Sequence, residues 1–297
     1  MKPAILVIDK PKGITSHMVI SKLRYLLGER QIGHCGTLDP MASGILPIML
    51  GTAVKASEYL VDHDKRYIAG IKLGLSTDTQ DTTGNVIARY EGELPGIEEL
   101  REAAKEFTGV IMQTPPMYSA LKVGGVKLLE LAREGITVER KAREVNIYSC
   151  DVFEEGGEFF LDVRCSRGTY IRTLCSDIGD RLGCGAAMCS LRRTEVGGFT
   201  LEDSIEFDSL NGMTKDGILD RAIPVEKMFL HLPEAKLQPF FDRLYANGEK
   251  ILLKKLRKIQ GEDGDLFRVC NDARGFYSLG EIIEKDGNKY FHLKKLF

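Results

Sequence analysis

Residues 33–40 (GHCGTLDP) constrain this chain more than any other segment of its 297 residues. Gly33 and Gly36 permit backbone angles that other residues avoid, and Pro40 pushes the preceding residue, Asp39, toward an extended conformation. A carboxylate is thereby displayed on a stiff loop, which is one way in which enzymes present a nucleophile. The simpler interpretation is an Asx turn, in which Asp39 bonds its own backbone, and spacing alone favours that interpretation.

Strand and helix patterns alternate along the chain without regular βαβ repeats, which predicts an α+β fold. Glycines lie at several predicted ends, such as Gly28 after the first helix and the pair at 156–157 between two strands. Thr169 is predicted to cap a helix that ends near Gly183. The strands are predicted at residues 4–8, 67–75, 145–153 and 158–165, and the helices at residues 16–27, 97–107 and 170–182.

The pattern changes after residue 228. A lysine-rich amphipathic segment precedes short strand patterns at residues 266–270, 276–283 and 290–293, and residues 271–275 form a predicted turn. We therefore expect two domains, the first over residues 1–228 and a small β-rich domain over residues 229–297.

Composition places the chain among ordinary globular proteins, with 43% hydrophobic and 28% charged residues. The seven cysteines are odd in number and lack a C-x-x-C pair, and the five histidines are scattered, so we expect neither a zinc site nor another metal centre. Reduced thiols, the short N-terminal apolar run and the lack of a stretch of about 20 apolar residues predict a cytoplasmic protein without a membrane partner.

Two basic segments stand out on a chain whose net charge is only −2. Residues 122–143 hold six basic and three acidic residues, and residues 236–258 hold seven basic and two acidic residues. Such clusters suit a polyanion that touches only part of the surface, although any one cluster is more often a solvated face.

The segment 33–44 (GHCGTLDPMASG) closely resembles the catalytic motif of the TruB class of tRNA pseudouridine synthases. Four further motifs of that family occur along the chain in the order that the family has them, so coincidence is a poor explanation. They lie at residues 9–13 (DKPKG), 64–67 (DKRY), 165–172 (CSRGTYIR) and 191–193 (LRR), and residues 115–122 (PPMYSALK) open the RNA-gripping insertion of the family at about 115–143.

The resemblance implies a pseudouridine synthase fold with a mixed, largely antiparallel sheet, and a C-terminal PUA-like RNA-binding domain. It also implies the reaction: one uridine in the T loop of tRNA, at position 55, is isomerised to pseudouridine by an isomerase that needs no cofactor. The partner is then the T arm of tRNA, no protein partner is required, and we expect a monomer.

The catalytic aspartate of the family corresponds to Asp39, which attacks the ribose C1′ or the uracil C6 or assists elimination at the sugar. The resemblance places Arg172 beside it, where a cation lowers a carboxylate pKa; taken alone, Arg172 reads as a surface arginine. Because Asp39 cannot reach a stacked base, the uridine must be flipped out. The supporting residues implied are Tyr67 and Leu191 as walls of the uracil pocket, with Lys10 and Tyr170 nearby, and the RNA-binding residues are His34, Lys122, Lys127, Arg133, Arg140 and Lys141.

Three alternatives remain open at this stage. The first is a guide-RNA-dependent pseudouridine synthase, and the second is a non-catalytic RNA-binding or tRNA-folding protein, which would not need Asp39. The third is a hydrolase or nucleotide-binding enzyme, which the missing G-x-S-x-G and G-x-x-x-x-G-K-[ST] motifs disfavour. Residues 78–84 (DTQDTTG) resemble the start of a calcium loop, but Arg89 occupies the position that requires a glutamate.

Overall fold

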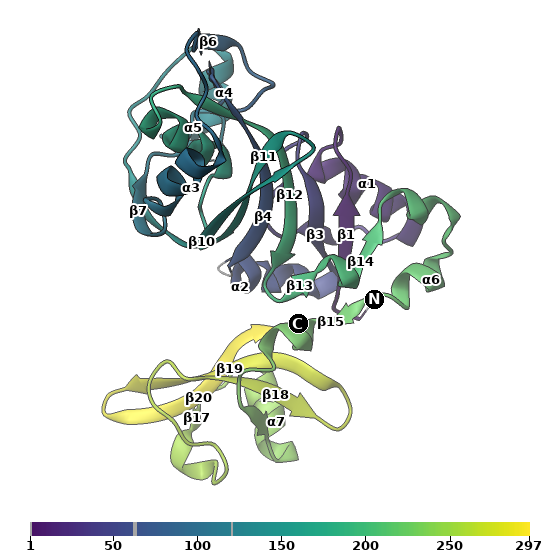
Figure 1. Ribbon diagram of the computed structural model, residues 1–297. Helices are drawn as coiled ribbons and strands as arrows, with labels where there is room; N and C mark the ends of the chain where they lie inside the picture. Colours follow the sequence, from purple (N-terminus) through teal and green to yellow (C-terminus); the bar gives the residue numbers. More distant parts are fainter. Residues whose placement is uncertain (1, 62–63, 120) are drawn as a thin grey trace.

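The computed structural model describes residues 2–61, 64–119 and 121–297, which form two lobes, each built around its own sheet (Figure 1). The larger sheet pairs its strands antiparallel except where β1 meets β14 and where β3 meets β12, as far as the described residues show. The predicted α+β fold with a mixed, largely antiparallel sheet is therefore confirmed. The strands of the larger sheet are, in spatial order, β14 (Ser204–Glu206), β1 (Ala4–Lys10), β3 (Ser43–Leu50), β12 (Ala186–Val196), β4 (Lys65–Leu73), β11 (Glu158–Cys165), β10 (Arg143–Glu155) and β7 (Gly109–Gln113). Three short strands pair with members of this series: β2 (Ile32–His34), β13 (Phe199–Thr200) and β15 (Ile223–Pro224).

Helix α1 (Ser16–Leu27) forms as the local pattern predicts. The Thr15 hydroxyl accepts a hydrogen bond from the Met18 amide at its start, and Gly28 ends it with a φ of 63°. Such a left-handed residue costs glycine little and closes the last turn. The helix buries one apolar stripe in the larger core, made of Val19, Ile20, Leu23 and Leu27.

Helix α5 (Ile171–Arg181) does not begin as predicted, because Thr169 is not its cap. The N-cap is Tyr170, which makes no side-chain capping bond, and the Thr169 hydroxyl donates to the Ser166 carbonyl. Gln113 of β7 replaces the cap: its carboxamide oxygen accepts from the Tyr170 amide at 2.7 Å, and its nitrogen donates to the Tyr170 carbonyl at 3.1 Å. A residue 57 positions away thus anchors the helix that carries Arg172.

The parallel pairing of β3 with β12 depends on Gly44. This residue has a φ of 102°, and a Cβ placed on it would lie 2.1 Å from the Arg193 carbonyl oxygen. Only glycine allows such a close approach of two backbones. The contact brings the loop before β3 directly against the strand that carries Leu191 and Arg193.

The smaller lobe holds five strands and helix α7 (Pro239–Ala246). The β-rich C-terminal part is therefore confirmed, whereas the boundary between residues 228 and 229 stays a prediction. Phe229 packs on Phe276 of β19 and on Phe297, which follows β20, and it meets Tyr59 of the larger lobe edge-on, so its ring joins the two lobes. The strands of this sheet are, in order, β16 (Glu234–Lys236), β18 (Leu266–Asn271), β19 (Gly275–Lys285), β20 (Asn288–Leu296) and β17 (Ile251–Leu252).

The remaining elements are short, and helix α3 (Ile97–Lys105) is the longest of them. Within the predicted insertion, β8 (Lys122–Val123) and β9 (Val126–Lys127) form a small hairpin that leads into α4 (Leu128–Arg133). None of the helices in the described ranges is long and apolar enough to cross a membrane. The other elements are η1 (Gly51–Ala56), α2 (Ser57–Val61), β5 (Leu75–Thr77), β6 (Val86–Arg89), η2 (Leu201–Asp203), η3 (Asp208–Gly212), α6 (Lys215–Leu219), η4 (Val225–Phe229) and η5 (Leu253–Lys255).

Candidate active site

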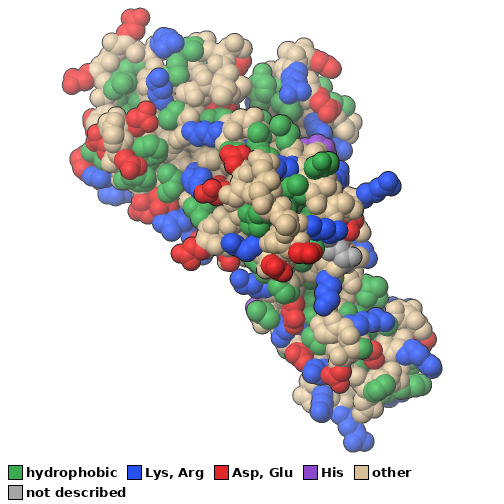
Figure 2. Space-filling view, turned by 90° about the vertical axis from the view of Figure 1, so that its right-hand side faces the viewer, with side chains coloured by type: hydrophobic (Ala, Val, Ile, Leu, Met, Phe, Trp, Pro, Cys, Tyr) green, Lys and Arg blue, Asp and Glu red, His purple; other side chains and the backbone are tan. Residues whose placement is uncertain are grey.

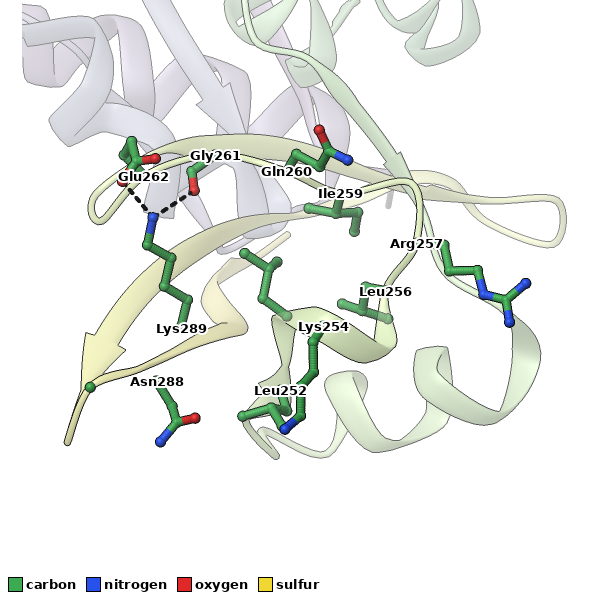
Figure 3. Close-up of a pocket in the computed structure, with 12 residues that line it drawn as sticks. Leu252, Lys254, Leu256, Arg257, Ile259, Gln260, Gly261, Glu262, Asn288 and Lys289 are labelled. Atoms are coloured by element: carbon green, nitrogen blue, oxygen red, sulfur yellow. Dashed lines mark hydrogen bonds and ion pairs between the residues drawn. The ribbon is translucent and has the colours of Figure 1, made fainter.

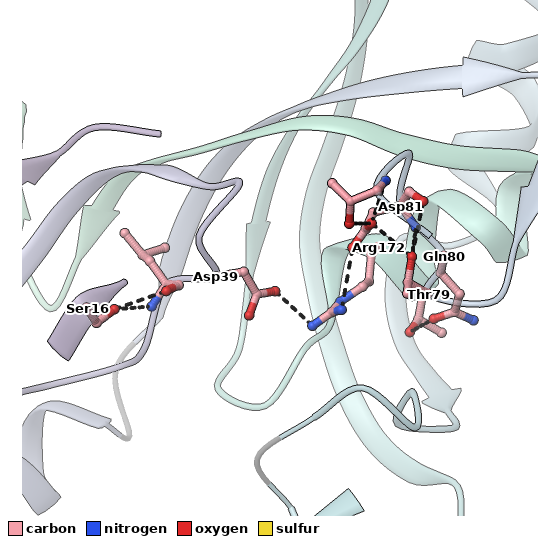
Figure 4. A network of polar contacts seen from close by, with 9 residues as sticks. Ser16, Asp39, Thr79, Gln80, Asp81 and Arg172 are labelled. Atoms are coloured by element: carbon pink, nitrogen blue, oxygen red, sulfur yellow. Dashed lines mark hydrogen bonds and ion pairs between the residues drawn. The ribbon is translucent and has the colours of Figure 1, made fainter. Parts of the chain in front are cut away.

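The loop that carries Asp39 connects β2 to β3 and is anchored on both sides of this residue. The buried Ser16 hydroxyl, at the first turn of α1, accepts from the Leu38 amide and donates to the Leu38 carbonyl, each at 3.0 Å (Figure 4). The Gly13 amide donates to the Pro40 carbonyl at 2.8 Å. The loop is therefore pinned to α1 and to the preceding turn, which leaves the Asp39 side chain little freedom to drift.

Lys10 is a buried lysine that ties the same loop to the end of β1. Its ammonium group is wholly shielded from solvent and donates to the carbonyls of Pro11, Ile14 and Ala42, at 2.9, 2.9 and 2.5 Å. Burial lowers the pKa of Lys10 to about 8, while the negative charge of Asp39 acts in the opposite direction. The predicted position of Lys10 at the loop agrees with these contacts.

Asp39 and Arg172 form an ion pair in the larger lobe. Arg172 Nη2 donates to Asp39 Oδ2 at 2.8 Å, as Figure 4 shows. The arginine side chain is 9% exposed and the aspartate side chain 42% exposed. The cation is thus buried behind a carboxylate that remains open to an incoming ligand, and the interpretation of Asp39 as a simple Asx turn does not describe this geometry.

Asp81 holds Arg172 from its other side, with 3.6 Å between Asp81 Oδ2 and Arg172 Nη1. Its second oxygen, Oδ1, accepts from the Thr79 hydroxyl and from both the amide and the hydroxyl of Thr83. A non-glycine residue with positive φ, Gln80, shapes this turn, and its side chain accepts from Thr173 of α5 at 2.7 Å. The stretch that resembles a calcium loop is thus a support for the arginine, a role that the sequence analysis missed.

Arg193 is a second buried arginine that contacts the Asp39 loop. Its side chain donates to the Gly36 carbonyl at 2.9 Å and to the Ile45 carbonyl at 2.8 Å, on either side of Asp39 in the sequence. It also hydrogen-bonds Tyr67. Within the described ranges it has no carboxylate partner, although it is only 1% exposed. The sequence analysis included it in the motif at residues 191–193 but assigned it no role.

Tyr67 and Leu191 lie on two neighbouring strands of the larger sheet. Tyr67 of β4 lies opposite Arg193 of β12, and Ala69 lies opposite Leu191, so these side chains share one face of the sheet. Tyr67 is 8% and Leu191 9% exposed, and both belong to the larger core. Burial raises the pKa of the Tyr67 hydroxyl, and the Arg193 charge acts against that rise.

Two further predicted residues lie close in the sequence to Arg172 and to Asp39. The Tyr170 ring lies 5.2 Å from the Arg143 guanidinium, which fixes the entry to α5 two residues before Arg172. Burial, followed by the charge of Arg193, lowers the pKa of His34 on β2. The Nδ1 atom of His34 is buried without a hydrogen-bond partner among the described residues.

The basic residues predicted in the insertion lie apart from Asp39. Lys122, Lys127, Arg133 and Lys141 are exposed. Arg140 donates to the Pro115 carbonyl at 3.1 Å. The structure therefore does not bring these five side chains into the cluster around Asp39 and Arg172.

Comparison with solved structures defines the class of protein. The fold is similar to that in a Cbf5–Nop10–Gar1 complex, with a TM-score of 0.72 and 27% identity over 99% of this chain and 84% of that chain. It is also similar to an H/ACA RNP bound to a substrate RNA containing 2′-deoxyuridine, with a TM-score of 0.70 and 26% identity over the same shares of the chains. The chain has the fold of a pseudouridine synthase.

Sequence comparison defines the family. The profile of the TruB family pseudouridylate synthase N-terminal domain matches residues 24–171, and that of the tRNA pseudouridylate synthase B C-terminal domain matches residues 172–229. A tRNA pseudouridine synthase B from an Azoarcus species is 43% identical over 93% of this chain and 90% of its own length, and one from Clostridium kluyveri is 41% identical over 99% of both. The chain belongs to the TruB family of pseudouridylate synthases and is an isomerase.

Proposed function

We propose that the chain converts the uridine at position 55, in the T loop of tRNA, to pseudouridine, with Asp39 as its catalytic residue. The observation that carries this proposal is the ion pair between the half-exposed Asp39 carboxylate and the buried Arg172 guanidinium, 2.8 Å apart. A buried cation favours the ionised carboxylate that covalent catalysis needs. Relatives named tRNA pseudouridine synthase B cover almost the whole chain, which supports tRNA as the substrate.

The reaction moves the ribose from N1 of uracil to C5 of the same base. The N1–C1′ bond breaks, the base turns over and the C5–C1′ bond forms. C5 loses its proton and N1 gains one, so that atoms and electrons balance without oxidation or hydrolysis. Asp39 is open to solvent on the side away from Arg172 and can approach the sugar or the base there. Tyr67 packs on the uracil in this proposal, and Leu191 forms the opposite wall.

A base that reaches Asp39 must leave the RNA stack, since the carboxylate lies on a loop pinned to the protein core. Enzymes that act on a base at such depth flip it out of the helix. The unsatisfied Nδ1 of His34 supports a role for that residue beside the vacated stack. The positive charges of Lys10, Arg172 and Arg193 around the Asp39 loop suit the negative charge that uracil carries when its N1–C1′ bond breaks.

The RNA-binding residues complete the proposal. Lys122, Lys127, Arg133, Arg140 and Lys141 of the insertion contact phosphates of the T arm, and the domain at residues 229–297 adds further contacts. Binding then weakens as the salt concentration rises, because phosphate contacts release counterions.

The test is the release of tritium from C5 of labelled uridine in a T-arm hairpin. We expect release by the wild-type chain and none by Asp39→Asn, which keeps the size of the side chain but removes its charge. Equal binding of the hairpin by both proteins would show that the variant is folded. Release at the wild-type rate by the variant would refute the assignment of Asp39.

The similarity to the Cbf5 complexes favours one alternative, a pseudouridine synthase that depends on a guide RNA. Activity of the purified chain on bare tRNA, without guide RNA or partner proteins, decides between the two. We expect full turnover under those conditions; conversion only on addition of a guide RNA would establish the alternative.

A further inference from the structure

The smaller lobe contains a cleft of about 530 Å³ that takes no part in the proposed reaction at Asp39. One wall is formed by residues 252–262, which follow β17, and the other by residues 287–289 at the turn between β19 and β20. Figure 1 shows β17 on the side of the lobe away from the larger sheet, so this cleft is remote from Asp39. The family profiles end at residue 229 and do not extend to this lobe.

The floor of the cleft is apolar and its rim is polar. Leu256 and Ile259, which are 7% and 4% exposed, turn into the space across from Asn288 and Lys289 (Figure 3). Lys289 is engaged, because its ammonium group contacts Glu262 and the Gly261 carbonyl. A cleft of this volume and composition is within the range of small-ligand sites.

The segment beside the cleft concentrates positive charge that the protein itself does not neutralise. Other lysines of this lobe pair with carboxylates, among them Lys236, Lys294 and Lys295. By contrast, the basic residues of 250–258 are exposed and lack an acidic partner within residues 2–61, 64–119 and 121–297; they are Lys250, Lys254, Lys255, Arg257 and Lys258. Lys254 and Arg257 line the cleft itself, and Figure 2 shows basic side chains projecting from this lobe.

These features together match one nucleotide of a single-stranded RNA segment. An unstacked base needs an apolar surface and a polar group at its edge, which Leu256, Ile259 and Asn288 offer. Its phosphates need cations that are not already paired, which Lys254 and Arg257 provide. A neutral metabolite would leave those charges without a function.

We infer that this cleft binds an unstacked nucleotide of the tRNA that lies outside the T arm. The inference rests on the proposed function, because it assumes that the T arm occupies the site at Asp39. It explains why the second basic segment lies on a separate lobe, away from the catalytic loop.

The experiment compares full-length tRNA with an isolated T-arm hairpin. For the double variant Lys254→Ala with Arg257→Ala, we expect KM for tRNA to rise roughly tenfold, and the slope of log affinity against log salt to fall by about 2, with kcat unchanged. KM for the hairpin should stay at the wild-type value. Arg274→Ala is the matched control, because it removes one charge from the turn at the opposite end of β19.

Methyl NMR of Leu256 and Ile259 in the Asp39→Asn chain separates the cleft from its charged rim. We expect shifts on adding tRNA and none on adding the hairpin. The inference is overturned if the double variant leaves KM for tRNA unchanged, or if it raises KM equally for tRNA and for the hairpin. It is also overturned if AMP, added alone as a free nucleotide, produces the same methyl shifts as tRNA. A wild-type chain that fails to convert the hairpin would instead refute the proposed function.

Discussion

Replacing Arg193 by methionine tests whether this buried arginine positions the loop that carries Asp39. The guanidinium donates to the carbonyls of Gly36 and Ile45 and hydrogen-bonds Tyr67, yet its 1% exposure keeps it from touching a substrate. Any effect of Arg193 on the reaction must therefore pass through the residues that it contacts. Methionine has a similar length and can fill the space, so that the loss is mainly one of hydrogen bonds and charge.

The magnitude follows from the groups left unpaired. A hydrogen bond to a charged group contributes about 1.5–3 kcal/mol, so two carbonyls without partners imply a cost of roughly 3–6 kcal/mol. Removing the cation also relieves its repulsion with Lys10 and Lys65, whose pKa values it lowers, so we expect the lower end of that range. This is a large part of the ~5–15 kcal/mol that stabilises a domain. A loop displaced by about 1 Å costs on the order of a hundredfold in rate.

The assay is single-turnover conversion of a T-arm hairpin, together with hairpin affinity and chemical denaturation. We expect Arg193→Met to lose about a hundredfold in rate with little change in affinity, and Arg193→Lys to recover part of that rate. The alkaline limb of the pH profile should also move upward, because the charge of Arg193 lowers the pKa of Lys10. Arg192→Lys is the control, since the Arg192 side chain pairs with Asp9 instead.

Wild-type rate in a folded Arg193→Met chain would refute a positioning role. If Arg193→Met instead lowers the free energy of unfolding and the hairpin affinity together and leaves the pH profile unmoved, the role of Arg193 is purely structural.

Three further predictions follow from the same loop. Burial lowers the pKa of Lys10 from its ordinary value of 10.5 to about 8. Between those pH values the unfolded chain binds a proton that the folded chain has lost, so the free energy of unfolding should rise with pH across that window, and it should rise less steeply in Lys10→Met. Gly44→Ala should cost ~3 kcal/mol or more, measured by urea denaturation, because a Cβ would lie 2.1 Å from a β12 carbonyl at a φ of 102°; Gly13→Ala, with φ of 89° and no atom within 4 Å, should cost only the strain of ~1–3 kcal/mol. Asp81→Asn should lower the single-turnover rate at least tenfold with little change in hairpin affinity, because it removes the charge behind Arg172; an unchanged rate would exclude that support.

Local patterns predicted the elements whose ends depend on near neighbours. Gly28 ends α1 where the sequence indicates, and the glycine pair at 156–157, with φ of 60° and 80°, turns β10 into β11. The same reasoning is wrong at Thr169, because Gln113, from a distant strand, satisfies the start of α5 in place of a local hydroxyl. Intrinsic capping preference is a weak term that one tertiary hydrogen bond overrides.

Some residues of the candidate site were also predicted from the sequence, and others were not. Asp39 was identified from its loop and from the resemblance to a family, but Asp81 and Ser16 were not recognised as parts of the site. Their partners, Arg172 and Leu38, are tens of residues away in the sequence, and no spacing rule connects them. Three expectations stay predictions: RNA binding by the basic residues of the insertion, the monomeric state, and the domain boundary between residues 228 and 229.

The sequence alone determined the stiff glycine- and proline-bounded loop, the amphipathic helices and the family, because backbone sterics and helical periodicity act over only a few neighbouring residues. Only the tertiary structure decided which charges meet: Arg172 reaches Asp39 across 133 positions, and Arg193 reaches Gly36 across 157. Charged side chains of the same type are interchangeable in a sequence pattern. Burial at a particular distance from a carboxylate or a carbonyl distinguishes them, and that is a property of the folded chain.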